Sequence, residues 1–293
     1  MRIEEVRLRY DDPARQAKTD LRFKADSMTS GLQIDGTIEY RERPVAMTLV
    51  TGSLRQALDD YRAMPIQAKF QVQETTLKVK GQIDSLLPLE NLTATVKAEG
   101  PDPARLGKAL GIPLPHLPPY RLRAQVHRKQ EPSGIQTLLF NNLDGTIGDS
   151  DIAGLLRVIT GNARPLVYAR LQSRKLDFDD LAGLIGAPPD PEETVSAKQQ
   201  MQAETFKKRD RVLPDKSIKF SQLQQLDADV EYRALRVQAP KLPLDDFTLH
   251  LTIDDGRLEM DRLDFGVAQG TVGITFEIDA HDSPVRVKLM TSI

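Results

Sequence analysis

Residues 32–40, Leu-Gln-Ile-Asp-Gly-Thr-Ile-Glu-Tyr, alternate apolar and polar side chains on either side of Gly36. Strict alternation of this kind is typical of an antiparallel strand that has one covered face and one wet face. The same period of two recurs in residues 21–26, 66–73, 77–83, 92–98, 122–126, 247–253 and 271–278. The sequence therefore predicts a mainly β protein.

These segments belong to a unit that occurs three times, at residues 32–61, 77–111 and 152–186. Each copy predicts an alternating strand, a glycine, a second strand, a proline, a third strand and a short helical turn. The recurring residues are Gly36, Gly81 and Gly154, then Pro44, Pro88 and Pro165. Repeated units usually stack into an elongated array with one continuous apolar surface. We therefore expect an elongated, curled antiparallel sheet with short edge helices near residues 54–61, 103–110 and 178–185.

The repeated pattern divides the chain into three parts. Residues 1–186 hold the repeated β units, and residues 217–293 are expected to continue the same sheet as a C-terminal β segment. Between them, residues 187–216 are rich in Pro, Gln, Lys and Glu. Such composition favours a linker or insertion that is partly helical or mobile.

Composition excludes several classes of protein. The 293 residues carry a net charge of -2 and no cysteine, which excludes disulfides, thiolate nucleophiles and Cys-ligated zinc and gives no sign of nucleic-acid binding. The N-terminus is not a signal peptide, and no apolar run approaches the roughly 18 residues that span a bilayer. Because the chain starts and stops within alternating sequence, we expect an excerpt from a longer protein.

Catalytic chemistry finds little support. The four histidines, at positions 116, 127, 250 and 281, show no metal-ligand spacing. Asp177, Asp179 and Asp180 are best explained as caps of a short helix. The sequence predicts no enzyme, no cofactor and no metal site.

The residues around Ser150 offer one catalytic alternative, a hydrolase. Gly148-Asp-Ser-Asp-Ile152 resembles a hydrolase nucleophile turn but lacks its second glycine. A hydrolase that uses Ser150 with Asp149 or Asp151 is therefore a minor alternative, and a plain turn is favoured.

The same stretch carries a family resemblance. Gly145-Thr-Ile-Gly-Asp-Ser-Asp-Ile-Ala-Gly154, followed by Ala-Arg-Pro-Leu at residues 163–166 and Lys-Leu-Asp-Phe-Asp-Asp-Leu at residues 175–181, resembles the AsmA family of Gram-negative envelope proteins. Residues 211–215, 227–230 and 242–258 are similar to the C-terminal part of that family. The motif positions, which shape turns rather than catalyse, are Gly145, Gly148, Asp149, Ser150, Gly154, Pro165, Asp177 and Leu181.

The resemblance implies a protein anchored in the inner membrane and extending into the periplasm, although this chain lacks a membrane helix. It also implies a relation to bridge-like lipid-transfer proteins, in which repeated β units form an open groove that shields phospholipid acyl chains. The expected partners are phospholipid and envelope proteins at the groove ends. No catalytic or cofactor-binding residue is implied.

An open groove would be lined by the apolar members of the alternating strands. The candidates are Ile34, Ile38, Phe70, Val72, Val79, Leu92, Val96, Leu249, Leu251, Ile274 and Phe276. From alternation alone, the same residues could equally close on each other as a sandwich or barrel core. With the resemblance, the leading function is phospholipid transport between the inner and outer membranes. The alternative is a scaffold for outer-membrane protein biogenesis that acts through its sheet edges.

Overall fold

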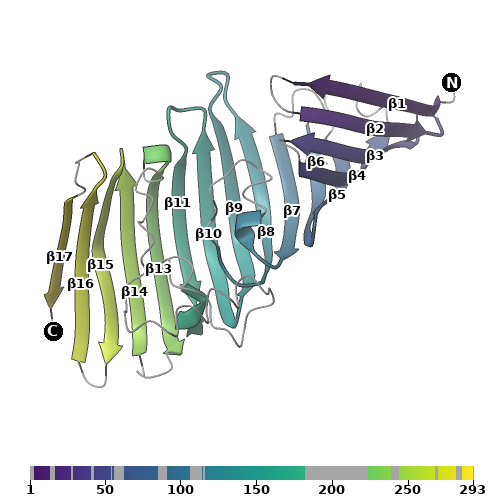
Figure 1. Ribbon diagram of the computed structural model, residues 1–293. Helices are drawn as coiled ribbons and strands as arrows, with labels where there is room; N and C mark the ends of the chain where they lie inside the picture. The colour runs from purple at the N-terminus through teal and green to yellow at the C-terminus, as the bar shows by residue number, and fades with distance from the viewer. Residues whose placement is uncertain are drawn as a thin grey trace, which may run out of the picture.

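The computed structural model of the chain describes residues 3–13, 17–27, 29–40, 43–53, 55, 63–84, 91–105, 114, 116–181, 224–238, 244–267, 270–281 and 286–292. Its strands form one sheet of 17 strands (Figure 1). The first nine are β1 (Ile3–Asp12), β2 (Ala17–Ala25), β3 (Gly31–Tyr40), β4 (Arg43–Ser53), β5 (Met64–Val72), β6 (Thr75–Ile83), β7 (Asn91–Gly100), β8 (Tyr120–Gln130) and β9 (Gln136–Ile147). The others are β10 (Ser150–Thr160), β11 (Leu166–Ser173), β12 (Leu176–Asp177), β13 (Asp227–Gln238), β14 (Leu244–Asp254), β15 (Arg257–Val267), β16 (Gly270–Asp279) and β17 (Arg286–Ser292), and the 3-10 helix η1 spans Phe178–Leu181.

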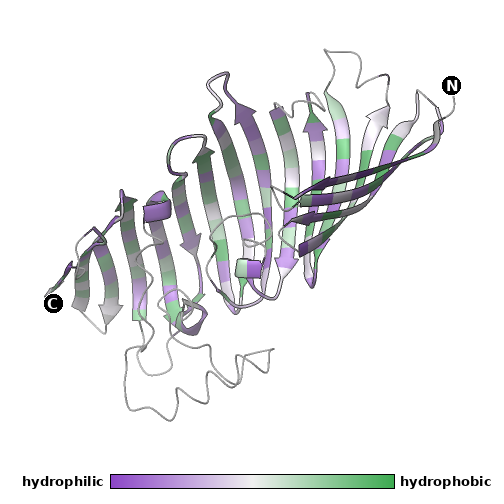
Figure 2. Ribbon diagram, turned by 45° about the horizontal axis from the view of Figure 1, so that its top comes forward, coloured by the Kyte–Doolittle hydropathy of each residue, from purple (hydrophilic) through white to green (hydrophobic). Residues whose placement is uncertain are grey.

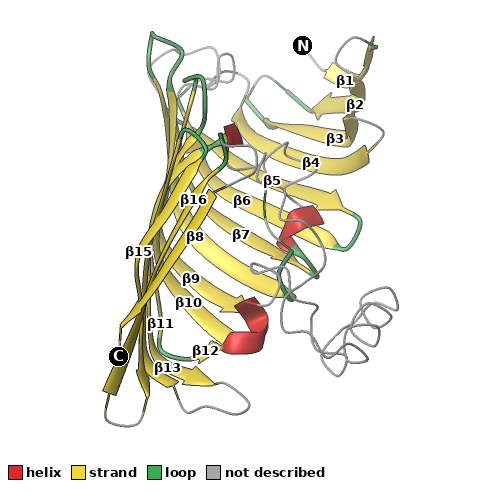
Figure 3. Cartoon of the chain, turned by 60° about the vertical axis from the view of Figure 1, so that its left-hand side comes forward, coloured by secondary structure: helices red, strands yellow, loops and turns green. Residues whose placement is uncertain are grey.

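The strands follow one another in chain order. Each strand from β1 to β11 pairs antiparallel with the next, and β13 to β17 do the same. The strand direction turns progressively along the sheet, so that β1–β3 run almost crosswise to β13–β17 in Figure 1. Seen from the side, the sheet bends into an open curve (Figure 3). The prediction of a mainly β, elongated and curled sheet is confirmed.

The sheet does not close on itself. Among the described strands, β1 pairs only with β2, and β17 pairs only with β16. Each therefore leaves one edge unpaired. The alternative in which the strands close as a barrel or sandwich core is wrong.

One junction in the sheet is parallel. β11 and β12 both run parallel to β13, with Leu166 opposite Asp227 and Leu176 opposite Val237. A parallel pair needs a crossover of a dozen or more residues to return the chain to the start of the next strand, whereas an antiparallel pair needs only a tight turn. Residues 178–226 make that connection. The segment predicted as a linker or insertion, residues 187–216, lies outside the described residues.

Within the described residues, each copy of the repeated unit holds two long strands rather than three, and the third copy adds the two-residue β12. Its copies correspond to the hairpins β3–β4, β6–β7 and β10–β11, and the recurring glycine lies inside the first strand of each hairpin. A Cβ built on Gly36, Gly81 or Gly154 would lie 2.0–2.1 Å from a carbonyl oxygen of the neighbouring strand. The glycine does not interrupt the strand; it permits a close backbone approach.

The expected edge helices are described only in part. Residues 103–105 are helical, and η1 occupies the start of the expected helix at residues 178–185. The remainder of those two helices, nearly all of the one expected at residues 54–61, and Pro88 lie outside the described residues.

Candidate functional site

Cross-strand register defines an apolar face of the sheet. Residues directly opposite each other on neighbouring strands project from the same face. A central row crosses β5 to β14 and consists of Ile66, Gly81, Ala94, Val126, Phe140, Leu156, Ala169, Val230 and Leu251. Every member is apolar or glycine. The face from which these residues project is called the apolar face below.

A second row, the rim row, lies two residues further along the same face, near one end of the strands. It runs through Met64, Ile83, Leu92, Arg128, Leu138, Val158, Val167, Ala228, Ile253, Leu258, Ile278 and Val287. All members but one are apolar. The alternation of green and purple along individual strands in Figure 2 follows from this arrangement.

The eleven candidate lining residues all project from the apolar face. Ile34 is in register with Leu49, Ala68, Val79 and Val96 across four further strands. Ile34 and Val72 are buried, and the other candidates are half-buried. The face extends to both edge strands, where Leu8 on β1 is 47% exposed and Leu289 on β17 is 62% exposed.

The opposite face is charged. Lys69, Lys78, Lys97 and Arg123 lie directly opposite one another on β5 to β8, and all four are exposed. Like charges in register repel each other unless water screens them. This polar face is therefore the wet side of the sheet.

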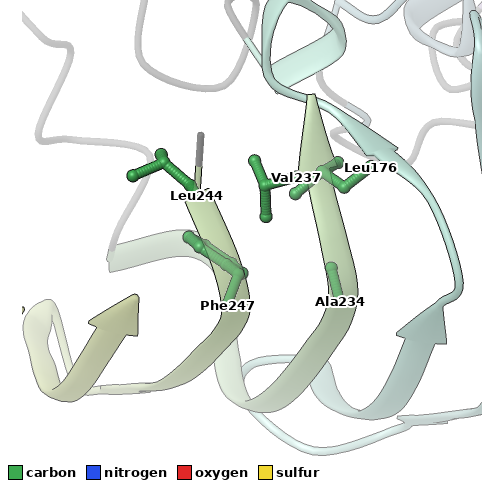
Figure 4. Close-up of a cluster of buried hydrophobic side chains, with 5 residues drawn as sticks. All are labelled: Leu176, Ala234, Val237, Leu244 and Phe247. Atoms are coloured by element: carbon green, nitrogen blue, oxygen red, sulfur yellow. The ribbon is translucent and has the colours of Figure 1, made fainter. Parts of the chain in front are cut away.

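Part of the apolar face is closed by its own packing. Leu176, Ala234, Val237, Leu244 and Phe247 form a buried cluster where β12, β13 and β14 meet (Figure 4). Tyr232 packs edge-on against Phe247 with 5.8 Å between ring centroids, and Leu249 packs against the cluster. Leu249 therefore has a packing role independent of any ligand.

The family motif builds a buried corner beside η1. The Asp180 Oδ2 atom accepts hydrogen bonds from the Ser150 hydroxyl (2.5 Å), the Ser150 N–H (2.9 Å) and the Asp149 N–H (3.1 Å). Gly148 has φ +58, and a Cβ there would lie 1.8 Å from Asp180 Oδ1. Because η1 holds Asp180 against the start of β10, the sequence needs glycine at 148 and a small hydroxyl residue at 150.

The hydroxyl of Ser150 is fully engaged in that corner. It donates to Asp180 and accepts a hydrogen bond from the Asp177 N–H at 2.8 Å. Ser150 is 4% exposed. A hydroxyl that is buried in this way has no access to substrate, which a nucleophile needs. The geometry gives the hydrolase alternative no support.

The aspartates of η1 play different parts. Asp177 caps the turn, because its Oδ1 atom accepts the Asp179 N–H at 3.2 Å. Asp180 instead binds β10, which lies 30 residues earlier in the chain. Sequence reasoning treated all three aspartates as caps and missed this contact. Pro165 lies in the β10–β11 turn, where its carbonyl accepts the Asp227 N–H at 2.8 Å.

Each histidine contacts a side chain outside any catalytic arrangement. The partners are Asp102 for His116, Thr93 for His127, Asp261 for His250 and Asp279 for His281. His250 borders a hollow of about 680 Å³ that Arg170, Glu231, Asp261 and Arg262 also line. Arg170 is paired there with Asp229 at 2.8 Å. Among the described residues, no group of three histidine or carboxylate side chains is placed to hold a metal ion.

The Asp180 corner predicts a specific pH dependence. Burial raises the pKa of the Asp180 carboxyl above its ordinary value. The stability that this group contributes is therefore fully present below the usual Asp pKa of about 3.9 and is lost as the pH rises through the raised value. We expect the stability advantage of the wild type over Asp180→Asn to shrink between pH 4 and pH 7 in urea unfolding. Carboxylates with lowered pKa values, such as Asp20 and Asp229, act in the opposite direction, but they are common to both proteins and cancel. A constant difference across this range would contradict the assignment.

Comparison with known proteins places these features in one family. A sequence profile described as the AsmA family matches residues 49–293. The chain is also similar to the AsmA family protein YhjG of Escherichia coli strain K12, with 24% identity over 266 residues that cover 90% of the chain. The chain spans 38% of the length of that relative. No solved structure matches the chain.

Proposed function

The chain belongs to the AsmA family, and from this membership together with an apolar face that is largely half-buried among the described residues we propose that it shields lipid acyl chains. Family membership indicates a role associated with the cell envelope. The finer proposal is that the chain is a non-enzymatic segment of a phospholipid path between the inner and outer membranes, located in the periplasm. Among the described residues, no helix has the length and apolar character needed to cross a bilayer.

The observation that carries the proposal is the continuity of the central and rim rows. Apolar surface exposed to water carries a free-energy penalty of roughly 25 cal/mol per Å². A monomeric protein rarely leaves a large contiguous apolar patch uncovered, and such patches commonly mark binding surfaces. Acyl chains fit because the contact they need is non-directional and extended, and the two apolar rows cross one strand after another.

The test is native mass spectrometry with lipid extraction on protein purified from bacteria without detergent. We expect phospholipid to co-purify at a reproducible stoichiometry. The double variant Phe70→Asp with Leu251→Asp should lose most of that lipid, because each carboxylate stands on the apolar face where an acyl chain would contact it.

A matched control places the same charges on the other face. Gln71→Asp with Thr252→Asp alters the adjacent positions of β5 and β14, which project from the polar face, and should retain the lipid. Circular dichroism establishes that both double variants remain folded. Equal lipid loss from both, or wild-type protein that is lipid-free, would contradict the proposal.

The exposed sheet edges favour a second candidate, a scaffold for outer-membrane protein assembly. Among the described strands, β1 and β17 each have one edge without a pairing partner and carry exposed apolar side chains, the features that strand addition by a partner requires. A lipid-free, compact and stable wild-type protein would give this candidate the lead.

A further inference from the structure

Arg128 is the single charged member of the rim row. It lies on β8 directly opposite Leu92 of β7 and Leu138 of β9. On the apolar face of β7 to β10, as the structure describes these strands, no other side chain carries a charge. A guanidinium therefore stands at the margin of an apolar surface with no carboxylate on that surface.

The contacts of Arg128 are incomplete. Its Nη2 atom donates to Gln130 Oε1 at 3.0 Å and to Gln136 Oε1 at 3.1 Å. Its Nη1 atom is buried and has no hydrogen-bond partner. Arg128 forms no ion pair with a described carboxylate, whereas Arg164, Arg170 and Arg257 all do.

This arrangement has the chemistry of an anion-binding site. Arg128 is half-buried, and its buried Nη1 donor without a partner calls for an explanation. Both glutamines bind Arg128 through their oxygen atoms, which leaves their Nε2 amides as donors for a further acceptor. The site lies at strand ends, since Gln130 ends β8 and Gln136 begins β9. For a ligand to reach the buried Nη1 atom, these terminal side chains have to rotate, and the binding test below measures whether they do.

We propose that Arg128, with Gln130 and Gln136, binds the phosphate of a phospholipid whose acyl chains lie on the apolar face. The assignment rests on the proposed function and adds to it a fixed place for the head group. Guanidinium matches phosphate oxygens in both charge and geometry. An amphiphile with its phosphate at the rim extends its acyl chains over Val126 and the neighbouring members of the central row.

The test compares lipids that share acyl chains and differ in the phosphate. Lipid-free protein is incubated with vesicles of equimolar dioleoyl phosphatidylglycerol and dioleoylglycerol, and the retained lipids are measured by native mass spectrometry. We expect the wild type to prefer the phospholipid by roughly tenfold, the ratio that one charge-assisted contact supplies. In Arg128→Met, the ratio of retained phosphatidylglycerol to retained dioleoylglycerol should fall towards 1. The total amount of retained lipid should be unchanged, because methionine restores the apolar row.

Two further variants isolate the role of Arg128. Arg123→Met removes a cation from the polar face of the same strand and should leave the preference unchanged, and Arg128→Lys should keep part of it. Thermal unfolding without lipid should give Arg128→Met a midpoint equal to or above that of the wild type, since the change removes an unsatisfied buried donor and adds apolar contact on the rim row.

The outcomes separate this inference from the proposed function. Lipid binding with the same phosphate preference in wild type and Arg128→Met would overturn the head-group site and leave the acyl-chain proposal standing. Failure of the wild type to retain either lipid would overturn both. In a further experiment, oleate is added to protein that has bound the phospholipid. If oleate displaces the phospholipid from the wild type but not from Arg128→Met, the site binds carboxylates and the phosphate assignment is overturned.

Discussion

Replacing Gly154 with valine is expected to lower the free energy of unfolding by about 4 kcal/mol or more, enough to unfold many domains of ordinary stability. A Cβ at this position would lie 2.1 Å from the carbonyl oxygen of Arg170 and 3.0 Å from the Cα of Leu171. The strand has little room to shift, because Gly154 is in register with Leu143 on one side and Leu171 on the other. Its φ of +146 adds strain for any L side chain. Urea unfolding followed by far-ultraviolet circular dichroism measures the loss.

Valine substitutions at two other glycines distinguish the cost of steric crowding from the cost of backbone strain. Gly134, in the β8–β9 turn, has φ +87 with open space around its Cβ position, so Gly134→Val reports strain alone and should cost about 1–2 kcal/mol. Gly81 lies in a crowded position, with a Cβ 2.1 Å from the Thr93 carbonyl oxygen, and Gly81→Val should be nearly as harmful as the change at Gly154. If Gly154→Val is no worse than Gly134→Val, the close strand approach is not what requires glycine there.

The sequence could predict the sheet and the face because both follow from local alternation. Once Ile34 and its alternate neighbours form a strand, side-chain direction is fixed by the pleat, and antiparallel pairing with the next strand carries the pattern across. This is why the eleven candidates share one face although they were selected one strand at a time.

Features that depend on distant pairing could not be predicted in the same way. Residues 166–173 and 227–238 lack the continuous apolar runs that are typical of buried parallel strands, so nothing within them indicates that β11 and β13 run in the same direction. Arg128 was missed although a signal was present, because it lies two residues after Val126 and so has the apolar parity of its own strand. The register with Leu92 and Leu138 then shows that it interrupts a continuous apolar row.

Replacing Asp180 with alanine is expected to lower the free energy of unfolding by about 3–5 kcal/mol. The change leaves three donors without their acceptor, namely the Ser150 hydroxyl and the N–H groups of Asp149 and Ser150. Asp180 and Ser150 are both buried, so water does not readily replace the carboxylate. Urea unfolding at pH 7 measures the loss, with Asp180→Asn as the matched control. Asparagine keeps an acceptor oxygen and should cost no more than about 1 kcal/mol.

Single and double variants of Ser150 and Asp180 also measure how strongly the two side chains depend on each other for their contribution to the free energy of unfolding. Ser150→Ala removes one donor to Asp180 and also the acceptor of the Asp177 N–H, while the two N–H groups stay bonded to Asp180. It should cost about 1–3 kcal/mol, and the double variant should cost less than the sum of the single changes. Such coupling would explain why Gly148, Ser150 and Asp180 occur together. The glycine admits the carboxylate, the serine engages it, and η1 holds it in place, so the motif fixes the junction where β10 leaves the preceding turn. Additive effects, or an Asp180→Ala protein as stable as the wild type, would mean that the junction is held by β9–β10 pairing alone and that the motif has another purpose.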